Sequence, residues 1–509
     1  MNKIISFFVV CLLGTTVYAD YDYSATFTFS GYSGSEELKD FPVLIRLSND
    51  SPKGFSKYQL QADFKDLAFF AGEIPLEYEI EKKDPDGTSY VWVKVPSLTK
   101  ETVITAKWGD KDAANAPIES GKSSLWTDSG YAGVWHFSED SGTVADSSGN
   151  NLHAEPKGNT AEMVSFRRGA VGNARFLTTT EAGNKNNLFE TKPYDLQLGS
   201  NFTFSAWVRC PYGLTGNWRL VSRKSNYADS NGWEIQGKDG AIVSIRSASS
   251  ASSQISVDDA STKWCYYTFV YDGENSKARV YSNGSLKSEV DMIPATDNGQ
   301  ALRFGQKGYP SYLAAYDECR LSGKRLSGDW VQADYDTVSK SDFYVASEAN
   351  VIGGEDEFTV VSENPIAGAV FPSAGVHKVT DGQTITFSAP SSGFTGADFR
   401  HAKYVGYTLI VDSESGSERV EFNELSGSYT HKSGSKAYLV WKTASWNTAQ
   451  DFGTKFSSIV TVNGFEEPGR ILAFPVLFKI SEDFPAGFRY EDVKSDGSDI
   501  LFTDMSGTV

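Results

Sequence analysis

The chain has 509 residues, which is too long for one hydrophobic core, so several domains are expected. It carries 47 Lys and Arg against 65 Asp and Glu, a formal net charge of −18. Such an acidic surface argues against nucleic acid and anionic lipid as partners, and it is also the usual solubilising surface of an exported protein. After the first twenty residues no apolar run approaches the roughly 20 residues of a membrane span, so no membrane insertion is expected.

The N-terminus has the pattern of a signal peptide. A positively charged start precedes an uncharged run over residues 4–14 that is too short to span a bilayer, and Val17 and Ala19 occupy the small-residue positions of a cleavage site. Cys11 lies inside the apolar run, which argues against a lipid anchor. We therefore expect residues 1–19 to be removed and the protein to be secreted or displayed at the cell surface.

Strand-like alternation dominates the rest of the chain, with turn residues between the runs. The clearest runs are Ser24–Ser30, Phe41–Leu47, Tyr90–Val95, Phe202–Val208 and Tyr266–Tyr271. This pattern predicts an all-β, multi-domain protein made of sandwiches or jelly rolls. Aromatic residues in strands are mostly core, so Phe202, Phe204 and Trp207 are expected to share one core face of their strand, and Tyr267 and Phe269 are also expected in the core.

A repeat brackets the chain. Residues 23–70 align without a gap onto 456–503, with about 15 identities in 48 positions where chance gives roughly three. The sequence ends before the second copy reaches the counterparts of the first copy's later strands. We therefore predict a first module over 20–118 and a truncated second copy over 455–509.

The first module resembles a known bacterial family. Its Phe41-Pro-Val-Leu44, Trp92-Val-Lys-Val-Pro96 and Trp108-Gly109 are similar to motifs of domain of unknown function 2341. The resemblance implies a β-rich module of an exported protein and no particular chemistry.

Residues 128–345 resemble a laminin-G-like, concanavalin A-like jelly roll. The resemblance rests on a series of segments in the family's order and spacing: Gly133-Val-Trp-His-Phe-Ser138, Gly142 to Asn150, Gly172 to Phe176, Phe202 to Val208, Tyr266 to Gly273, Val280 to Gly284, Phe304-Gly305 and Tyr316-Asp-Glu-Cys-Arg-Leu321. It implies a jelly roll that binds ligands through its rim loops. Residues 355–450 have regular strand spacing instead, which predicts a small immunoglobulin-like β module that acts as a spacer.

No recognisable catalytic set accompanies these modules. Glycosidases on the jelly-roll fold resemble one another in a Glu-x-Asp-x-Glu strand, which this sequence does not contain. His136 alternates with Trp135 and Phe137, and no nucleophile motif accompanies it, so it is interpreted as a structural histidine. We therefore expect that the protein is not an enzyme.

One metal hypothesis follows from the jelly-roll resemblance. Domains of this type often hold Ca²⁺ at a rim, and Asp146, Asn150 and Asp317 are matching oxygen donors here. The same Asp-Ser-Ser-Gly-Asn loop is equally good turn chemistry without an ion. No other cofactor is indicated.

Three cysteines follow the signal peptide: Cys210, Cys265 and Cys319. An exported protein can keep one disulfide, and their wide spacing argues against a metal site. Cys210 and Cys265 become neighbours if the strands that contain them pair, and Cys319 can meet either, so all three pairings stay open.

The leading hypothesis for function is therefore an exported, non-catalytic binding or adhesion protein whose partner is a carbohydrate or a cell-surface protein. Trp218, Tyr309 and Tyr312 are aromatic residues among turn residues, which suits contact with a sugar face, although each also suits a lid over the core. Two alternatives stay open. One is a purely structural element of an adhesin or envelope layer, and the other is an accessory region of a larger secreted glycan-degrading enzyme.

Overall fold

The computed structural model divides the chain into two compact units, Met1–Gly354 and Glu355–Val509. The residues that it describes are 21–445, except 50, 62, 85–86, 111–121, 159–162, 167–168, 178–186, 194–200, 210–216, 225–231, 239–241, 247–251, 257–262, 292–298, 306–313, 353–355, 363–369, 392–393, 396–400 and 414–415. The predicted signal peptide and the predicted second copy over 455–509 lie outside the described residues.

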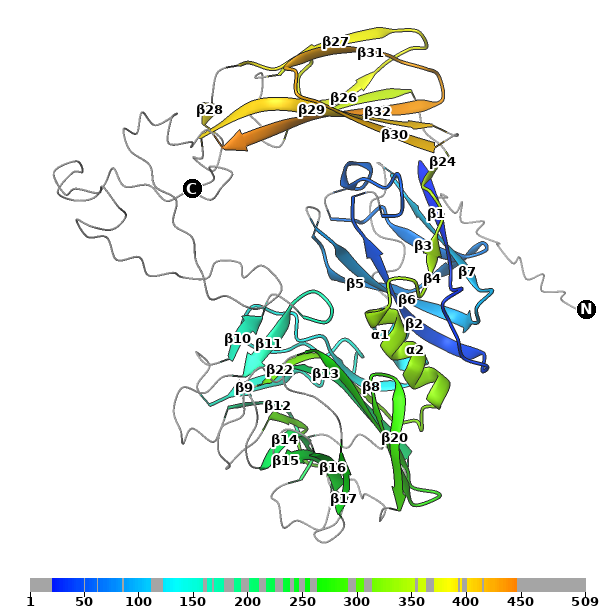
Figure 1. Ribbon diagram of the computed structural model, residues 1–509, viewed down its shortest axis with the longest axis vertical. Coiled ribbons are helices and arrows are strands. Elements are labelled where there is room, and N and C mark those ends of the chain that lie inside the picture. Colours follow the sequence, from blue (N-terminus) through cyan, green and yellow to red (C-terminus); the bar gives the residue numbers. More distant parts are fainter. Residues whose placement is uncertain are drawn as a thin grey trace, which may run out of the picture. The chain divides into compact units, whose positions relative to one another are not determined.

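The first unit begins with two small sheets (Figure 1). The larger has the order β23-β1-β7-β3-β4, with β24 also paired to β1. Its strands are β1 (Tyr23–Thr28), β3 (Ala68–Ala71), β4 (Ile74–Leu76), β7 (Val103–Trp108), β23 (Val345–Ala346) and β24 (Asn350–Val351). The smaller has the order β2-β6-β5, formed by β2 (Leu38–Leu47), β6 (Ser89–Leu98) and β5 (Tyr78–Lys82). The sheets contact each other through Phe69 and Tyr78, whose ring centroids are 5.4 Å apart.

Alternation explains why these segments are strands. In β1 the side chains of Tyr23, Ala25 and Phe27 are buried and those between them are half-buried, as a strand with one core face requires. The short 3-10 helix η1 (Lys57–Gln59) follows β2 and carries a capping box made by Ser56 and Gln59.

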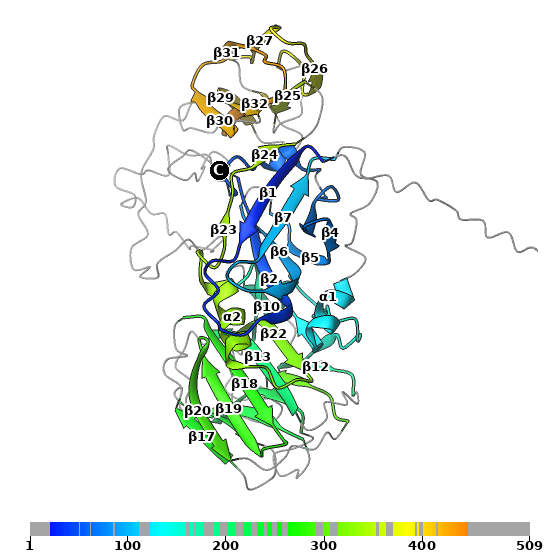
Figure 2. The same cartoon turned by 90° about the vertical axis from the view of Figure 1, so that its right-hand side faces the viewer.

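A jelly roll of two antiparallel sheets occupies the rest of the first unit (Figures 1 and 2). The eight-stranded sheet has the order β10-β11-β22-β13-β18-β19-β20, with β8 paired to β22. Its strands are β8 (Tyr131–Trp135), β10 (Met163–Phe166), β11 (Ala174–Leu177), β13 (Asn201–Arg209), β18 (Cys265–Asp272), β19 (Lys277–Ser282), β20 (Ser285–Asp291) and β22 (Ala314–Ser322). The seven-stranded sheet has the order β17-β16-β15-β14-β21-β12-β9. Its strands are β9 (Ala154–Lys157), β12 (Leu188–Thr191), β14 (Asn217–Ser222), β15 (Glu234–Lys238), β16 (Ile242–Arg246), β17 (Ser252–Ser256) and β21 (Arg303–Gly305).

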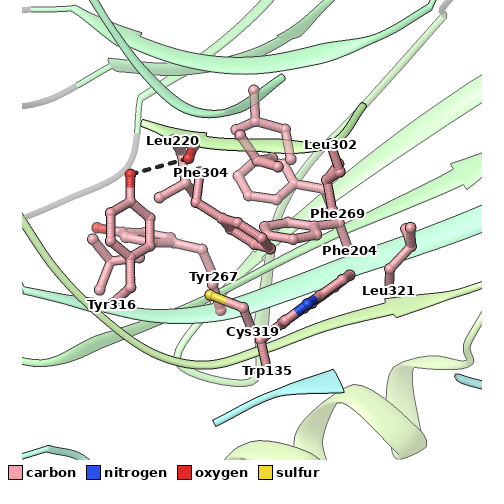
Figure 3. Packing of buried hydrophobic residues seen from close by; sticks show 14 of the residues in the cluster. Trp135, Phe204, Leu220, Tyr267, Phe269, Leu302, Phe304, Tyr316, Cys319 and Leu321 are labelled. Carbon is pink, nitrogen blue, oxygen red and sulfur yellow. Dashed lines mark hydrogen bonds between the residues drawn. The ribbon is translucent and has the colours of Figure 1, made fainter. Parts of the chain in front are cut away.

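The jelly-roll core lies between these two sheets and is dominated by aromatic rings (Figure 3). Trp135 and Phe304 meet edge to face with their centroids 5.0 Å apart. The hydroxyl of Tyr316 donates a hydrogen bond of 3.0 Å to the carbonyl of Leu220, which satisfies the one polar group of that ring. Phe202, Phe204, Tyr267 and Phe269 belong to this core, as the alternation predicts.

The first unit contains two helices, α1 (Lys122–Ser129) and α2 (Gly328–Ser339). Helix α1 packs against the three-stranded sheet and β8, and α2 packs against β2 and the outer side of the eight-stranded sheet. The ring of Trp330 in α2 packs on Phe41 of β2, and Tyr335 stacks on Trp207 with centroids 5.6 Å apart. The prediction that Trp207 shares the core face of Phe202 and Phe204 is therefore wrong, because odd and even positions of a strand point to opposite faces. Trp207 is buried all the same, under α2. Neither helix is long and apolar enough to cross a membrane, among the residues that the structure describes.

The second unit is a small β structure of its own. One sheet has the order β26-β25-β32-β29-β28, with β30 paired to β29, and a second consists of β27 and β31. The strands are β25 (Glu357–Ser362), β26 (Gly375–Lys378), β27 (Thr384–Ser388), β28 (Phe394–Thr395), β29 (His401–Ser413), β30 (Gly416–Phe422), β31 (Ser426–Thr430) and β32 (Ser435–Ser445). Its core includes Phe358, Phe387, Tyr407 and Trp441. The whole described chain is thus all-β, built from a jelly roll and β-sandwich modules.

Candidate functional site

Seven charged side chains are buried where the outer face of the eight-stranded sheet meets the three-stranded sheet and α2. We call them the junction cluster: Glu79, Glu81, His136, Asp317, Glu318, Arg320 and Asp334. None of these side chains is more than 7% exposed. Charges are rarely buried unless they are paired or bind a ligand, so the cluster is the strongest candidate site in the described part of the chain.

Strand β5 supplies two carboxylates to the cluster. Glu79 and Glu81 are two residues apart, and both side chains contact His136. The register of β5 shifts at a bulge between Ile80 and Lys82, so Glu81 is the extra residue opposite β6. Two indoles hold them: Trp126 Nε1 donates to Glu79 Oε2 at 2.7 Å, and Trp92 Nε1 donates to Glu81 Oε2 at 2.7 Å. The Ser147 hydroxyl donates to the other oxygen of Glu79 at 2.8 Å.

A β-bulge in β22 supplies the facing charges. Ser205 of β13 pairs with Arg320, whereas Trp207 pairs with Asp317, so β22 contains one residue more than β13 over this stretch. Glu318 has a positive φ of 47° at this point. Because of the extra residue, Asp317, Glu318 and Arg320 all take part in the cluster, while Cys319 packs in the jelly-roll core.

His136 lies at the centre and joins the two groups of carboxylates. Its Nδ1 is 2.6 Å from Glu318 Oε1 and 3.6 Å from Glu81 Oε2, and its Nε2 is 3.3 Å from Glu79 Oε2. Each ring nitrogen therefore faces a carboxylate, and the ring bridges β5 and β22.

Arg320 fills the rest of the cluster. Its Nη1 donates to Asp334 Oδ1 of α2 at 2.7 Å and its Nη2 donates to Glu318 Oε2 at 2.5 Å. The guanidinium lies 4.2 Å from the ring centroid of Trp92 and 4.8 Å from that of Trp126. Stacking with charge-assisted hydrogen bonds is a role that suits arginine and not lysine.

The carboxylates of the cluster differ in their electrostatic surroundings. Burial opposes ionisation of Glu79, but His136 and the hydrogen bonds from Trp126 and Ser147 outweigh it and lower its pKa to about 2. Burial, and then the neighbouring charge of Glu318, raise the pKa of Glu81 well above its ordinary value. Burial and Glu318 raise the pKa of Asp317 in the same way. The cluster thus combines firmly ionised carboxylates with others for which the ionised form is unfavourable.

Two oxygens of the cluster have no hydrogen-bond partner among the described residues: Glu81 Oε1 and Asp317 Oδ1. The second oxygen of Asp317 accepts a hydrogen bond of 2.9 Å from the amide of Val171. One ligand atom from each of Glu81, His136 and Glu318 lies within 4.8 Å of the other two, a spacing at which three residues could hold a metal ion.

The predicted calcium donors are divided between two places. Asp317 belongs to the junction cluster, whereas Asp146 lies in a loop, where its carboxylate accepts hydrogen bonds from the amides of Val134, Ser148 and Leu152 at 2.9 to 3.0 Å. Asn150 Nδ2 in the same loop donates to the carbonyl of Ala132 at 2.9 Å. The backbone of the loop satisfies these side chains, which is turn chemistry.

The structure tests the predicted disulfide for two of the three cysteines, because Cys265 and Cys319 are among the described residues. Strands β13 and β18 pair, with Val208 opposite Cys265, so the strands that end at Cys210 and begin at Cys265 are neighbours, but Cys210 itself lies outside the described residues. Cys319 is a buried free thiol. A bond between Cys210 and Cys265 stays a prediction.

Of the three predicted sugar-binding aromatics, Trp218 alone is among the residues that the structure describes. Trp218 is the second residue of β14 and lies opposite Gly237 of β15 in the register. Tyr309 and Tyr312 lie outside the described residues.

The sequence did contain one signal for the junction cluster. Glu77-Tyr-Glu79-Ile-Glu81 is a run of alternate carboxylates, the pattern that a search for Glu-x-Asp-x-Glu is designed to find, but with Glu in the middle and outside the jelly roll. His136 was interpreted as a structural histidine that is satisfied by its neighbours, and its neighbours are carboxylates from distant segments.

Comparison with known proteins identifies part of the jelly roll. Residues 182–332 match the concanavalin A-like lectin/glucanases superfamily. No curated protein sequence matches the chain.

Among solved structures, the chain is similar to clostridial toxin binding domains. The binding domain of Paraclostridial Mosquitocidal Protein 1 is 16% identical, over 58% of this chain and 68% of that one, with a TM-score of 0.35. The binding domain of botulinum neurotoxin serotype G is 17% identical, over 61% and 72%, with a TM-score of 0.33. That of serotype D is 12% identical, over 59% and 80%, with a TM-score of 0.33. These scores are low, and the assignment rests on the family match: the chain contains a concanavalin A-like domain at residues 182–332.

Proposed function

We propose that the protein is an exported, non-catalytic binding protein whose jelly roll recognises a carbohydrate or a cell-surface protein through its rim loops. The observation that carries this proposal is the match of residues 182–332 to a superfamily described by its lectins and glucanases. Export rests on the signal-peptide pattern of residues 1–19. The similarity of residues 20–118 to domain of unknown function 2341 is part of the same proposal and adds no chemistry.

The non-catalytic part of the proposal is supported by the state of the buried carboxylates. Glu79, Glu318 and Asp334 are held by His136 or Arg320 in a site whose side chains are almost wholly buried. Substrate has no access to carboxylates in such surroundings unless the two parts of the first unit separate.

A glycan array probed with the purified full chain tests the proposal. Binding is expected to a limited set of glycans and to be lost when Trp218 and Tyr309 are both replaced by Ala. The matched control is Phe371→Ala, which removes an exposed aromatic side chain, 63% exposed, from the second unit. Glycan binding that survives the double substitution contradicts this placement of the site.

The same glycan array tests the alternative that the protein is a purely structural element with no soluble ligand. The junction cluster, and the pairing of β24 with β1, hold the N-terminal sheets and the jelly roll together, as an element of an adhesin or envelope layer that carries mechanical force would require. A chain that binds no glycan and no cell-surface protein supports this alternative.

Calcium at the Asp146 loop is a separate part of the proposal. A thermal melt with excess Ca²⁺ and with a chelator checks it, with Asp146→Asn as the variant. An unchanged melting temperature on adding excess Ca²⁺ contradicts it.

A further inference from the structure

Three side chains of the junction cluster converge from three separate segments. Glu81 comes from β5, His136 follows β8, and Glu318 is at the bulge of β22. Their ligand atoms lie within 4.8 Å of one another. Atoms that share one metal ion at bond lengths of about 2.0–2.2 Å are separated by up to roughly 4 Å, so small side-chain movements bring this set into coordination.

A second observation points to a ligand at the same place. Glu81 Oε1 has no hydrogen-bond donor among the described residues, although the Glu81 side chain is 0% exposed. Besides Trp92, the Glu81 carboxyl has a hydrogen-bond partner in the carboxyl of Glu318, which satisfies it only through a shared proton. An unpaired buried carboxylate oxygen is costly, since burial removes the water that would otherwise solvate it. Asp317 Oδ1 is a second such oxygen, and it interacts electrostatically with Glu81, Glu318 and His136.

The surrounding side chains orient these three residues as the outer partners of metal ligands do. Glu79 contacts His136 Nε2, which leaves Nδ1 to face Glu318 and Glu81. A carboxylate on the far nitrogen of a metal-binding histidine selects its tautomer and fixes its ring. Trp92 holds Glu81, and Arg320 holds Glu318, through hydrogen bonds of 2.7 and 2.5 Å.

Charge balance also favours a cation. The cluster contains five carboxyl groups against two cationic side chains, Arg320 and a protonated His136, so the excess carboxyl groups either hold protons or face a bound cation. A divalent cation that replaces the proton on His136 Nδ1 reduces this excess while it coordinates the oxygen that has no partner.

We propose that Glu81, His136 and Glu318 bind a divalent transition-metal ion of the zinc type, which fastens β5 to the jelly roll. A ring nitrogen with two carboxylates is a donor set that suits Zn²⁺ or Mn²⁺, whereas Ca²⁺ takes six to eight oxygens. Asp317 Oδ1 or water completes the coordination. The site is distinct from the calcium loop at Asp146, and it does not depend on what the jelly roll binds.

The test measures zinc binding by the purified full chain, which is first made metal-free with a chelator that is then removed. Zn²⁺ alone is then titrated by calorimetry, and bound metal is counted by mass spectrometry. One ion per chain is expected, with a rise in the melting temperature of the first unit. Co²⁺ in place of Zn²⁺ is expected to give a visible absorption band that reports nitrogen and oxygen ligands.

Glu81→Gln is the decisive variant, because it keeps the shape of the side chain and removes one buried charge. It is expected to weaken zinc binding by more than about 100-fold, beyond the loss typical of outer partners. Without metal it is expected to melt at or above the temperature of the metal-free wild type, since like-charge repulsion with Glu318 is relieved. The matched control is Glu77→Gln, four residues earlier, whose carboxylate pairs with Lys94 outside the cluster.

Three results overturn the proposal. One is a wild-type chain that binds no zinc at one equivalent, and another is zinc binding that Glu81→Gln leaves unchanged. The third is a Glu81→Gln chain that, without metal, melts well below the metal-free wild type and whose melting temperature rises on adding zinc as much as that of the wild type. This result would show that a proton shared by Glu81 and Glu318 holds the carboxyl groups together instead of a metal ion. If Glu81→Gln does not fold, two other measurements test the proposal: the zinc affinity of Glu318→Gln, which is expected to fall in the same way, and the Co²⁺ absorption band of the wild type. Unchanged zinc affinity in Glu318→Gln, or no Co²⁺ band, overturns the proposal.

Discussion

His136 Nε2 lies 3.3 Å from Glu79 Oε2, and this contact joins the segment after the first jelly-roll strand to β5 of the three-stranded sheet. The two parts of the first unit therefore share a buried polar interface. Polar interfaces of this kind depend on every member, because removing one partner leaves the other charge buried and unpaired.

Replacing His136 by Ala is expected to destabilise the first unit by about 3–5 kcal/mol, because Glu79 and Glu318 then lose their shared cation. Denaturant unfolding followed by tryptophan fluorescence measures the change. The control is His153→Ala, at an exposed histidine of the same unit whose Nδ1 accepts one hydrogen bond, of 3.0 Å, from the Asp146 amide, and it is expected to cost no more than about 1 kcal/mol. Equal effects of the two substitutions would count against a central role for His136.

Arg320→Lys tests the geometry of the guanidinium. Lysine keeps the charge but cannot donate in two directions while it stacks on Trp92 and Trp126, so a loss on the order of 2 kcal/mol is expected. Arg279→Lys is the control at a more exposed ion pair with Glu289, for which about 0–1 kcal/mol is expected. The same unfolding experiment compares them.

Glu79→Gln separates an orienting role from a coordinating one. The variant is expected to bind one zinc ion with about 10- to 100-fold lower affinity, because Gln still faces His136 Nε2 but holds the ring less firmly. Calorimetry gives both the stoichiometry and the affinity. Complete loss of zinc with a folded chain would instead make Glu79 a direct ligand.

Cys319→Ser is expected to destabilise the jelly roll by about 1–3 kcal/mol, because it places a hydroxyl in the aromatic core between the two sheets (Figure 3). Cys319→Ala, which adds no polar group, is expected to cost less. Thermal melts of the two variants rank them. The prediction fails if the serine variant is the more stable of the two.

The pH dependence of stability has a contribution from Asp66, next to η1. Burial raises its pKa to about 6, partly offset by hydrogen bonds from the amides of Gln61 and Gly109, while Asp63 adds to the rise. The folded state therefore holds this proton more tightly than the unfolded chain, and stability is gained as the pH falls from about 6 to the ordinary value of an aspartate near 4. Above pH 6 both states are ionised and this gain is absent.

Comparison with Asp66→Asn isolates that contribution. Between pH 6 and 4 the melting temperature of the wild type is expected to rise by a few degrees relative to the variant, with a constant difference above pH 7. Tyr21 and Asp110 lie near Asp66 and are unchanged in both proteins, so their contributions cancel. A difference that is the same at all these pH values contradicts the assignment.

The fold was accessible from the sequence because alternation is a local signal. Runs such as Ser24–Ser30 and Phe202–Val208 became β1 and β13, with ends that differ by one or two residues. Trp207 shows where this reading goes wrong: its aromatic character suggested the core, but its parity places it under α2.

The junction cluster was not accessible in the same way. Glu81, His136 and Glu318 are separated by 55 and 182 positions, and no local pattern states that β5 and β22 face each other. The bulge at Glu318 also breaks the period of two on which prediction of side-chain direction depends. The alternate carboxylates of Glu77, Glu79 and Glu81 were the one feature of the sequence that indicated a cluster of acidic side chains at β5.

The return of the chain to β1 has a mechanical consequence. Ile352 donates a hydrogen bond of 2.8 Å to the carbonyl of Asp22, so the first unit is entered and left at one corner, beside the pairing of Tyr23 with Val351. Tension applied to the chain on both sides of this unit would peel β24 from β1, one hydrogen bond after another, before any force reached the jelly roll. The short strands β23 and β24 would thus separate from β1 at low force, while the jelly roll, which lies between β1 and β23 in the chain, keeps its shape.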